Sequence, residues 1–135
     1  MSRKDARDNA FKCVYEYEFN KEKSIEEILN FCYEENEVND SEKEYIDEVV
    51  KGVAQNIEKI DENILKHLKN WSISRIAKID LAILRVAIYE ICYMSNVIPF
   101  KVSINEAVEL AKKYGNPDSK SFVNGLLAKV IEDKK

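Results

Sequence analysis

Two short segments of this sequence carry side chains that could hold a polyanion. In the first, Arg3, Lys4 and Arg7 fall within the first two turns of a predicted N-terminal helix. Each cation there costs about 0.3 to 1 kcal/mol, because the free N–H groups of a helix N-terminus carry partial positive charge. Basic side chains and free N–H groups together can bind an anion such as phosphate. The alternative is a frayed, solvated terminus, since Asp5 and Asp8 lie among the basic residues.

The second segment, residues 118–122, begins the last predicted helix. An exposed Phe122 would offer a ring for an unpaired base, and Lys120 could meet a phosphate. Asp118 or Ser119 is expected to cap the helix. Because a carboxylate repels phosphate, Asp118 could contact RNA only by accepting a hydrogen bond from a base amino group. The alternatives are a purely structural cap and a Phe122 that packs in the core.

Residues suited to catalysis or metal binding are sparse. His67 is the one histidine, and it is predicted to be a surface or boundary residue of a helix. No Ser/His/Asp or Cys/His pairing can be proposed, and no cluster has metal-ligand spacing, so neither an enzyme nor a cofactor or metal site is expected.

The isolated glycines form no phosphate-binding loop. Gly115 is predicted to end a helix in the left-handed conformation, ahead of Pro117. Gly125 lies inside the last helix, where glycine costs about 1 kcal/mol relative to alanine. Close packing of another helix is the favoured explanation for Gly125, and close approach of a ligand is the alternative.

The charge is unevenly distributed along the chain. The net charge is −4, yet residues 21–66 hold 14 acidic and 6 basic side chains, whereas residues 67–135 hold 7 acidic and 11 basic. The local field, and not the net charge, therefore decides where RNA could bind.

Compartment and membrane association can also be predicted. The three cysteines lack C-x-x-C spacing, and no apolar segment of a signal peptide follows Arg3. We therefore expect a cytoplasmic protein. The longest apolar stretches are interrupted by Arg85 and Glu90, so no membrane span is expected.

Capping boxes mark the predicted helix starts. In this pattern a Ser oxygen accepts a backbone N–H three residues later, and an acidic side chain reaches back. Four matches precede apolar residues at helical spacing: Ser2-x-x-Asp5, Ser24-x-x-Glu27, Ser41-x-x-Glu44 and Ser103-x-x-Glu106. The pattern favours an all-α protein with few breakers.

A helix over residues 80–94, capped by Asp80, is the predicted centre of the core, since apolar residues surround its axis. We predict about seven helices in two packed three-helix groups within one domain, residues 1–135. The N-terminal group covers about residues 1–57 and the C-terminal group about residues 58–131, with a helix break at residues 52–57.

The chain resembles the NusB family of bacterial antitermination proteins over essentially its whole length. The points of resemblance are Trp71, Arg75-Ile76, Asp80, the stretch ILRVAIYE at 83–90, INEA at 104–107 and FVNG at 122–125. The resemblance implies an RNA-binding protein that catalyses nothing. It also implies boxA-type single-stranded RNA and NusE, a small-subunit ribosomal protein, as partners on the RNA polymerase elongation complex of rRNA operons.

By this resemblance the RNA surface combines Arg3, Lys4, Arg7 and Tyr15 with Asp118, Ser119, Lys120 and Phe122. The C-terminal group is where the protein partner is expected to dock. A homodimeric scaffold that binds only protein is the alternative, since some relatives self-associate through the RNA face. A fused methyltransferase is not expected, because 135 residues leave no room for a catalytic domain.

Overall fold

The computed structural model describes residues 3–69 and 72–134, and this part of the chain is helical without any β-strand. Trp71 and Ser2 lie outside the described residues. The elements in chain order are α1 (Arg3–Phe19), α2 (Ile25–Glu35), α3 (Asp40–Gln55), α4 (Ile57–Lys66), the short 3-10 helix η1 (Ile73–Arg75), α5 (Lys78–Tyr93), α6 (Phe100–Tyr114) and α7 (Ser119–Lys134). The all-α prediction is confirmed, and η1 is an element that the sequence pattern missed.

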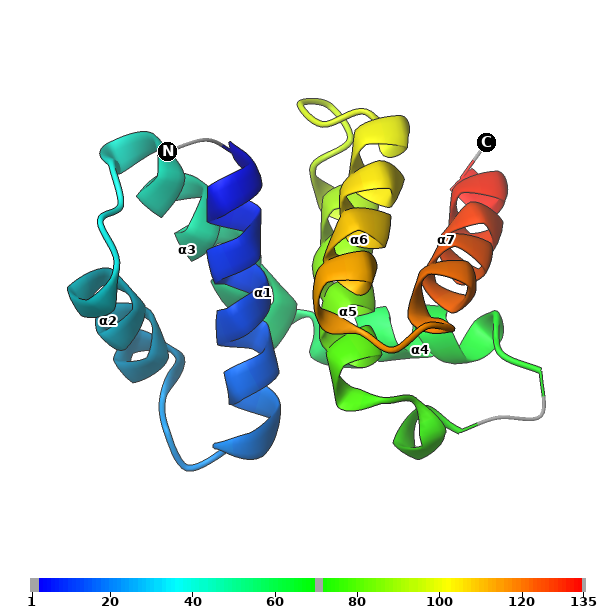
Figure 1. The fold of residues 1–135 in the computed structure, drawn as a ribbon, viewed down its shortest axis with the longest axis horizontal. Coiled ribbons are helices and arrows are strands. Elements are labelled where there is room, and N and C mark those ends of the chain that lie inside the picture. The colour runs from blue at the N-terminus through cyan, green and yellow to red at the C-terminus, as the bar shows by residue number, and fades with distance from the viewer. Residues whose placement is uncertain (1–2, 70–71, 135) are drawn as a thin grey trace.

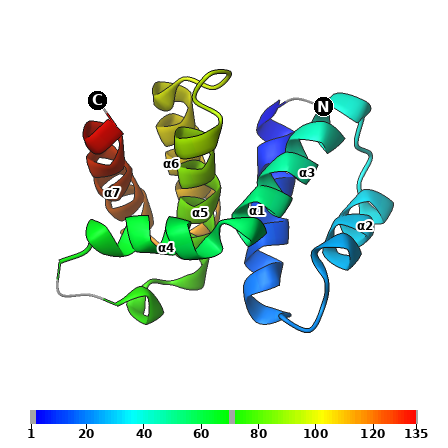
Figure 2. The same ribbon diagram turned by 180° about the vertical axis from the view of Figure 1, so that it is seen from behind.

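Two groups of three helices pack side by side. Helices α1, α2 and α3 form one group and α5, α6 and α7 the other (Figure 1). Helix α4 runs from the end of α3 across to the second group, as seen from behind in Figure 2. Helix α1 packs against both α3 and α5, so that the buried side chains of the two groups form one continuous core.

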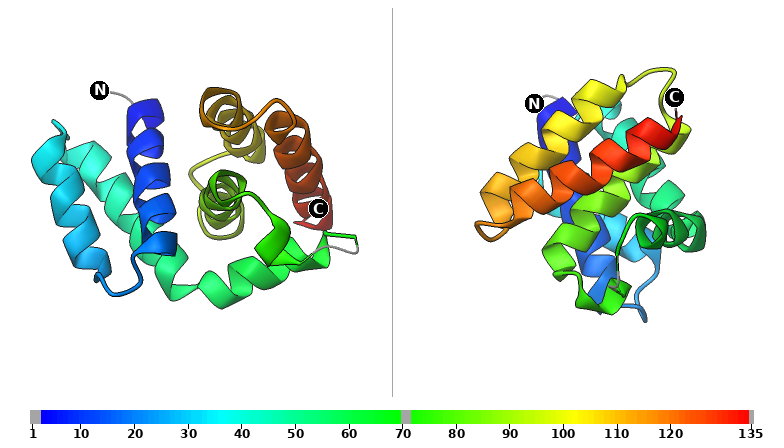
Figure 3. Two further views of the ribbon diagram at one scale, coloured as in Figure 1. Left: turned by 60° about the horizontal axis from the view of Figure 1, so that its bottom comes forward. Right: turned by 90° about the vertical axis from the view of Figure 1, so that its right-hand side faces the viewer.

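Helix α5 is the centre of this core, as predicted. Every residue from Asp80 to Ile91 is buried, because α1, α3, α4, α6 and α7 all contact this helix. In the end-on view of Figure 3, α5 is enclosed by its neighbours, and the turned view shows α6 and α7 crossing on the outer face of the second group. A helix that is apolar all round can be stable only in such surroundings.

Two of the predicted capping boxes are corrected by the structure. The box at Ser24 is present as predicted, with Glu27. Helix α3, however, begins two residues earlier than Ser41 indicated: the Asn39 side chain accepts from the Glu42 N–H at 2.8 Å, and the Glu42 side chain accepts from the Asn39 N–H at 2.9 Å. Asparagine caps a helix as well as serine does. Asn39-x-x-Glu42 and Ser41-x-x-Glu44 are therefore two overlapping capping patterns, and the helix begins at the first.

Helix α6 also begins earlier than predicted, because Pro99 occupies its N-cap position. Ser103 therefore lies inside the helix, where it is buried and its hydroxyl donates to Glu90 at 2.8 Å. Likewise α5 begins at Lys78 after Ala77, so Asp80 is a buried residue of the first turn and not the cap.

Gly115 does end α6, but its φ of −88° is not left-handed. What requires glycine there is space. A Cβ atom at Gly115 would lie 2.4 Å from the Ser119 hydroxyl oxygen and 2.8 Å from the Ala111 carbonyl oxygen.

Among the described residues, no helix combines the length and the apolar character needed to cross a bilayer.

A charge in the middle of α5 should abolish folding. Ile88 has no exposed surface, so Ile88→Asp would bury an unpaired carboxylate at a cost comparable to a typical total stability of about 5 to 15 kcal/mol. The control Ile88→Val should cost only about 0.5 to 1.5 kcal/mol. Urea unfolding followed by circular dichroism measures both. A cooperative transition for Ile88→Asp at the wild-type midpoint would contradict the central position of α5.

Candidate nucleic-acid interface

The N-terminal turn of α1 presents two of its three predicted basic residues to solvent. The side chains of Arg3 and Lys4 are exposed. The Arg3 guanidinium lies 4.7 Å from the centre of the Tyr45 ring on α3. A cation held over an aromatic face keeps its outward N–H groups available, so Arg3 and Lys4 can meet a phosphate at this end of the molecule.

Arg7 is placed differently from the prediction, because its side chain is buried. The Arg7 Nε and Nη2 atoms donate to the two carboxylate oxygens of Glu90 at 2.8 and 3.2 Å. Burial alone would lower the pKa of Arg7, but the hydrogen bonds and the charge of Glu90 raise it overall. Tyr45 and Ser103 also donate to Glu90. A direct contact of Arg7 with phosphate is therefore not supported, since it would strip a fully buried carboxylate of its cation.

A cavity of about 180 Å³ between α1 and α6 joins Lys4 to Lys113, and four carboxylates also line it, those of Asp5, Asp8, Glu106 and Glu109. The ammonium groups of Lys113 and Lys12 lie 5.1 and 5.8 Å from the centre of the Tyr114 ring. Both also approach Asp8, at 3.6 and 3.4 Å, and the Tyr114 hydroxyl donates to Asp8 at 2.7 Å. No local sequence pattern predicts this cluster, because its members come from opposite ends of the chain.

The structure brings Tyr15 and Ser119 together. Both line a cavity of about 440 Å³, which also includes Tyr114, between the C-terminal half of α1 and the turn before α7. The Tyr15 ring is partly buried and meets Phe19 edge-on at 5.0 Å. Ser119 is buried, and its hydroxyl accepts from the Asn116 N–H at 3.1 Å. The Ser119 side chain is thus committed to the turn.

Asp118 and Lys120 are both exposed at the start of α7. The Asp118 carbonyl accepts the first helical hydrogen bond, from the Phe122 N–H at 3.2 Å, and its own N–H donates to the Asn116 side chain at 2.9 Å. The backbone of Asp118 therefore defines the helix start. Its carboxylate and the Lys120 ammonium face solvent, where a ligand can reach them.

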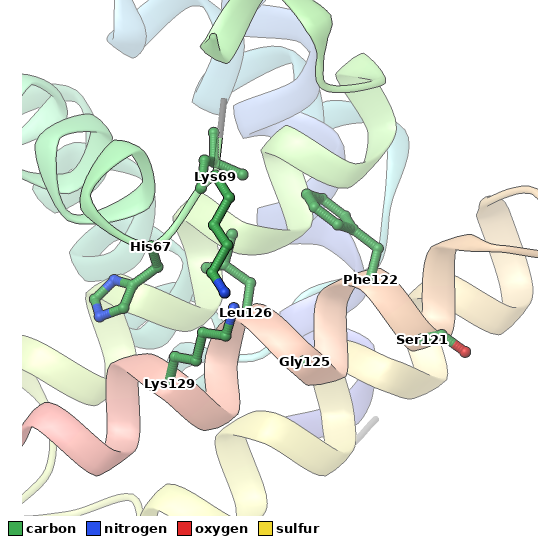
Figure 4. Close-up of a pocket in the computed structure, with 8 residues that line it drawn as sticks. His67, Lys69, Ser121, Phe122, Gly125, Leu126 and Lys129 are labelled. Atoms are coloured by element: carbon green, nitrogen blue, oxygen red, sulfur yellow. The ribbon is translucent and has the colours of Figure 1, made fainter. Parts of the chain in front are cut away.

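Phe122 lines an open pocket of about 340 Å³ between α7 and the end of α4 (Figure 4). The ring is partly buried against the core, yet it forms one wall of the pocket. Lys69 and Lys129 extend toward the same part of the pocket, and among the described residues neither ammonium has an ion-pair partner. An aromatic wall beside two unneutralised cations suits a nucleotide.

Gly125 contributes to this pocket by lacking a side chain. No heavy atom lies within 4 Å of a Cβ built at Gly125, so the prediction that it permits close helix packing is wrong. The structure favours the alternative, a position that leaves room for a ligand. Lys69 and Lys129 escaped sequence reasoning, and the unexplained Gly125 was the one local signal for the pocket.

His67 closes one side of the pocket, at the boundary between α4 and α7. Its Nε2 atom lies 2.6 Å from an Asp133 carboxylate oxygen, and its Nδ1 atom lies 2.8 Å from the Asn63 carbonyl oxygen. The hydrogen bond with His67 lowers the pKa of Asp133. These contacts give His67 a structural role, in which it joins α7 to the end of α4.

The predicted residues do not form a single cluster. Arg3 and Lys4 lie at one end of α1, and Tyr15 lies toward the other end of a helix that is about 25 Å long. Lys113 and Tyr114 fill the interval, since they link the first cavity to the one that contains Tyr15 and Ser119. The start of α7 then leads to the Phe122 pocket. We call this path the basic-aromatic surface.

The chain is similar to known proteins over nearly its whole length. The NusB family model matches residues 4–132. The transcription antitermination protein NusB of Acetivibrio thermocellus is 51% identical over 134 residues, which cover 99% of this chain and 91% of that protein. The protein of the same name from Alkaliphilus oremlandii is 42% identical, with coverage of 99% and 96%.

Solved structures agree with the sequence comparison. T. maritima NusB superimposes with a TM-score of 0.92 at 33% identity, covering 98% of this chain and 92% of that one. A crystal structure of the antitermination factors NusB and NusE in complex with dsRNA gives a TM-score of 0.89 at 30% identity, covering 97% and 96%.

Alanine substitutions at two glycines should distinguish a glycine that borders open space from one that is closely packed. Gly125→Ala should raise the free energy of unfolding by up to about 1 kcal/mol, because alanine favours the helix and its methyl group meets nothing. Gly52→Ala should destabilise the protein, since the new Cβ would lie 2.2 Å from the Tyr89 ring. Urea unfolding measures both. Destabilisation by Gly125→Ala would show that another segment packs against that position.

Proposed function

The chain belongs to the NusB family, and on this premise we propose that it is a transcription antitermination factor that binds RNA together with a NusE-type protein. It acts by binding, with no chemical step. The observation that carries the proposal is the basic-aromatic surface, which runs from Arg3 and Lys4 to the Phe122 pocket on a protein whose net charge is −4.

The cations of this surface are assigned to the phosphates. Arg3 and Lys4 are exposed at one end, Lys120 lies at the start of α7, and Lys69 and Lys129 line the pocket of which Phe122 forms one wall. Phosphate contacts of this kind supply affinity without reading sequence. Because acidic residues dominate the region 21–66, RNA is steered to this surface and away from the exposed sides of α2 and α3.

The aromatic and acidic residues are assigned to the bases. In this proposal Phe122 stacks with a base inside the 340 Å³ pocket, and Asp118 accepts a hydrogen bond from a base amino group beside it. Tyr15 lines the cavity between the two ends of the surface. Ser119 and Arg7 serve by positioning: Ser119 holds the turn before α7, and Arg7 anchors α1 through Glu90.

The proposed ligand is single-stranded RNA of the boxA type, in the leaders of rRNA operons. A pocket with an aromatic wall can take only a base that has left its stack, which favours an unpaired strand. NusE, a ribosomal protein of the small subunit, is the proposed protein partner, and the RNA polymerase elongation complex is the proposed setting. The crystal structure of a NusB and NusE pair with RNA, which shares this fold, supports the pairing.

Substitutions at both ends of the basic-aromatic surface should weaken RNA binding. The double change Arg3→Glu and Lys4→Glu should flatten the salt dependence, since each lost phosphate contact removes about 0.7 from the log–log slope for a single strand. Lys69→Gln and Lys129→Gln should each act in the same direction. Phe122→Ala should cost about 1 to 3 kcal/mol of binding free energy if a base stacks there. Fluorescence anisotropy with a boxA oligonucleotide and its scrambled counterpart measures all of these.

The matched control is Lys59→Gln on α4, an exposed lysine that lines none of the cavities described above. It should change neither affinity nor salt slope. Equal effects of Lys59→Gln and Lys129→Gln would show that nonspecific charge attraction, and not the basic-aromatic surface, holds the RNA. A Phe122→Ala protein with lower stability and wild-type RNA affinity would assign the ring to the core alone.

RNA and NusE should bind cooperatively. The free chain offers only a few cations to a polyanion, so a basic partner docked beside the surface extends it without any conformational change. Linkage requires that RNA strengthen NusE binding by the same factor. Titration of boxA RNA into this protein, into NusE and into their mixture should show the tightest binding for the mixture.

Equal affinity of the mixture and of the better single protein would remove the cooperative mechanism. Failure of the two proteins to associate would favour the homodimeric scaffold instead. In that case, sedimentation of the free chain should show a dimer that RNA does not dissociate.

A further inference from the structure

Two of the three cysteines line the same cavity between α1 and α2. Cys13 on α1 and Cys32 on α2 are both buried, with 4% and 8% of their surface exposed, and both line a cavity of about 240 Å³. Lys12 and Phe31, which are exposed, also line this cavity, so it opens to solvent. A small reagent can therefore reach a pair of thiols held in one place by two packed helices.

The surroundings make the two thiols unequal. Hydrogen bonding with the neighbouring Cys13 thiol lowers the pKa of the Cys32 thiol against the opposing effect of burial. The Asn36 amide nitrogen, 3.9 Å from the Cys32 sulfur, and the charge of Lys12 act in the same direction. The same hydrogen bond and burial raise the pKa of Cys13. Cys32 is thus the thiol that more readily becomes a thiolate, the nucleophilic form.

We propose that Cys13 and Cys32 form an oxidisable dithiol, in which Cys32 is the attacking thiolate, Cys13 is the resolving thiol and a low-molecular-weight disulfide such as oxidised glutathione is the oxidant. This modification site is independent of RNA binding. It needs only the α1–α2 contact and the open cavity.

The reaction has two exchange steps. The Cys32 sulfur attacks one sulfur of oxidised glutathione, so that a mixed disulfide forms and one glutathione leaves as a thiolate, which takes up a proton. In the mixed disulfide the Cys32 sulfur is uncharged, so it accepts a hydrogen bond from Cys13 less strongly than the thiolate did. Cys13 therefore releases its proton to solvent more easily. The Cys13 thiolate then attacks the Cys32 sulfur and expels the second glutathione. Two protein thiols are oxidised while one disulfide is reduced to two thiols.

Cys92 serves as the internal comparison. It is partly exposed on α5, and burial raises its pKa although the charge of Lys134 and the Asn63 amide nitrogen, 3.6 Å from its sulfur, act in the opposite direction. Although more exposed than Cys32, Cys92 should react more slowly, since a smaller fraction of it is present as thiolate.

The experiment treats the full chain with a glutathione redox buffer, quenches with acid, alkylates the remaining thiols and maps the peptides by mass spectrometry. The wild type and Cys92→Ser should both yield a peptide pair joined through Cys13 and Cys32. Cys13→Ser should stop at a glutathione adduct on Cys32. Cys32→Ser should leave Cys13 unmodified over the same time. Asn36→Ala should slow the first step.

If a variant does not fold, the rates at which the individual cysteines of the wild type are labelled still test the proposal. Circular dichroism identifies such a variant, and competitive labelling of the wild type with iodoacetamide then gives the order of reactivity. Labelling of Cys92 as fast as that of Cys32 would overturn the proposal. So would a wild-type protein that accumulates the Cys32 adduct without forming the bond to Cys13.

Discussion

The buried carboxylate of Glu90 is the constraint on which the arrangement of helices depends. It has no exposed surface and is satisfied by Arg7 from α1, Tyr45 from α3 and Ser103 from α6. Apolar contacts alone are compatible with many relative rotations of these helices. A buried carboxylate is compatible only with the rotations that leave its hydrogen-bond partners in place. Removing one partner of such a pair typically costs about 3 to 5 kcal/mol. Glu90 thus fixes three helices around α5 at a single point.

A second ionic cluster fixes the other end of α1. Arg85 on α5 donates to Asp61 on α4 at 2.8 and 3.0 Å and to Glu18 on α1 at 2.7 Å. Arg7 and Glu18 are both held, so α1 is anchored near both ends against α5. The basic-aromatic surface extends along this anchored helix. A surface that must match the spacing of phosphates gains from such rigidity, because less conformational entropy is lost on binding.

The polarity of the molecule follows from the same packing. The acidic region 21–66 covers α2, α3 and α4, whereas α6 and α7 carry an excess of basic residues in the C-terminal part. Helix α1 lies between the two and contributes Arg3 and Lys4 to the basic side. A protein of negative net charge can therefore present a local field that attracts a polyanion on its basic side.

Local sequence determined which segments are helical, because helix periodicity, caps and breakers act over a few neighbouring residues. It thus indicated an all-α fold, the central position of α5 and the position of Arg3 and Lys4 at a helix start. Two capping patterns overlap at Asn39 and Ser41. Which residue caps α3 depends on small differences between the two caps, and the sequence pattern does not contain these differences. Tertiary structure alone decided that Arg7 pairs with Glu90, 83 positions away, that Lys12 and Lys113 share the Tyr114 ring, and that Gly125 opens a pocket beside Lys69. Such pairings depend on how the helices pack against one another, and this packing is determined by the whole core. The apolar periodicity of a helix shows on which face a side chain lies. It does not show which residue of another helix that side chain contacts.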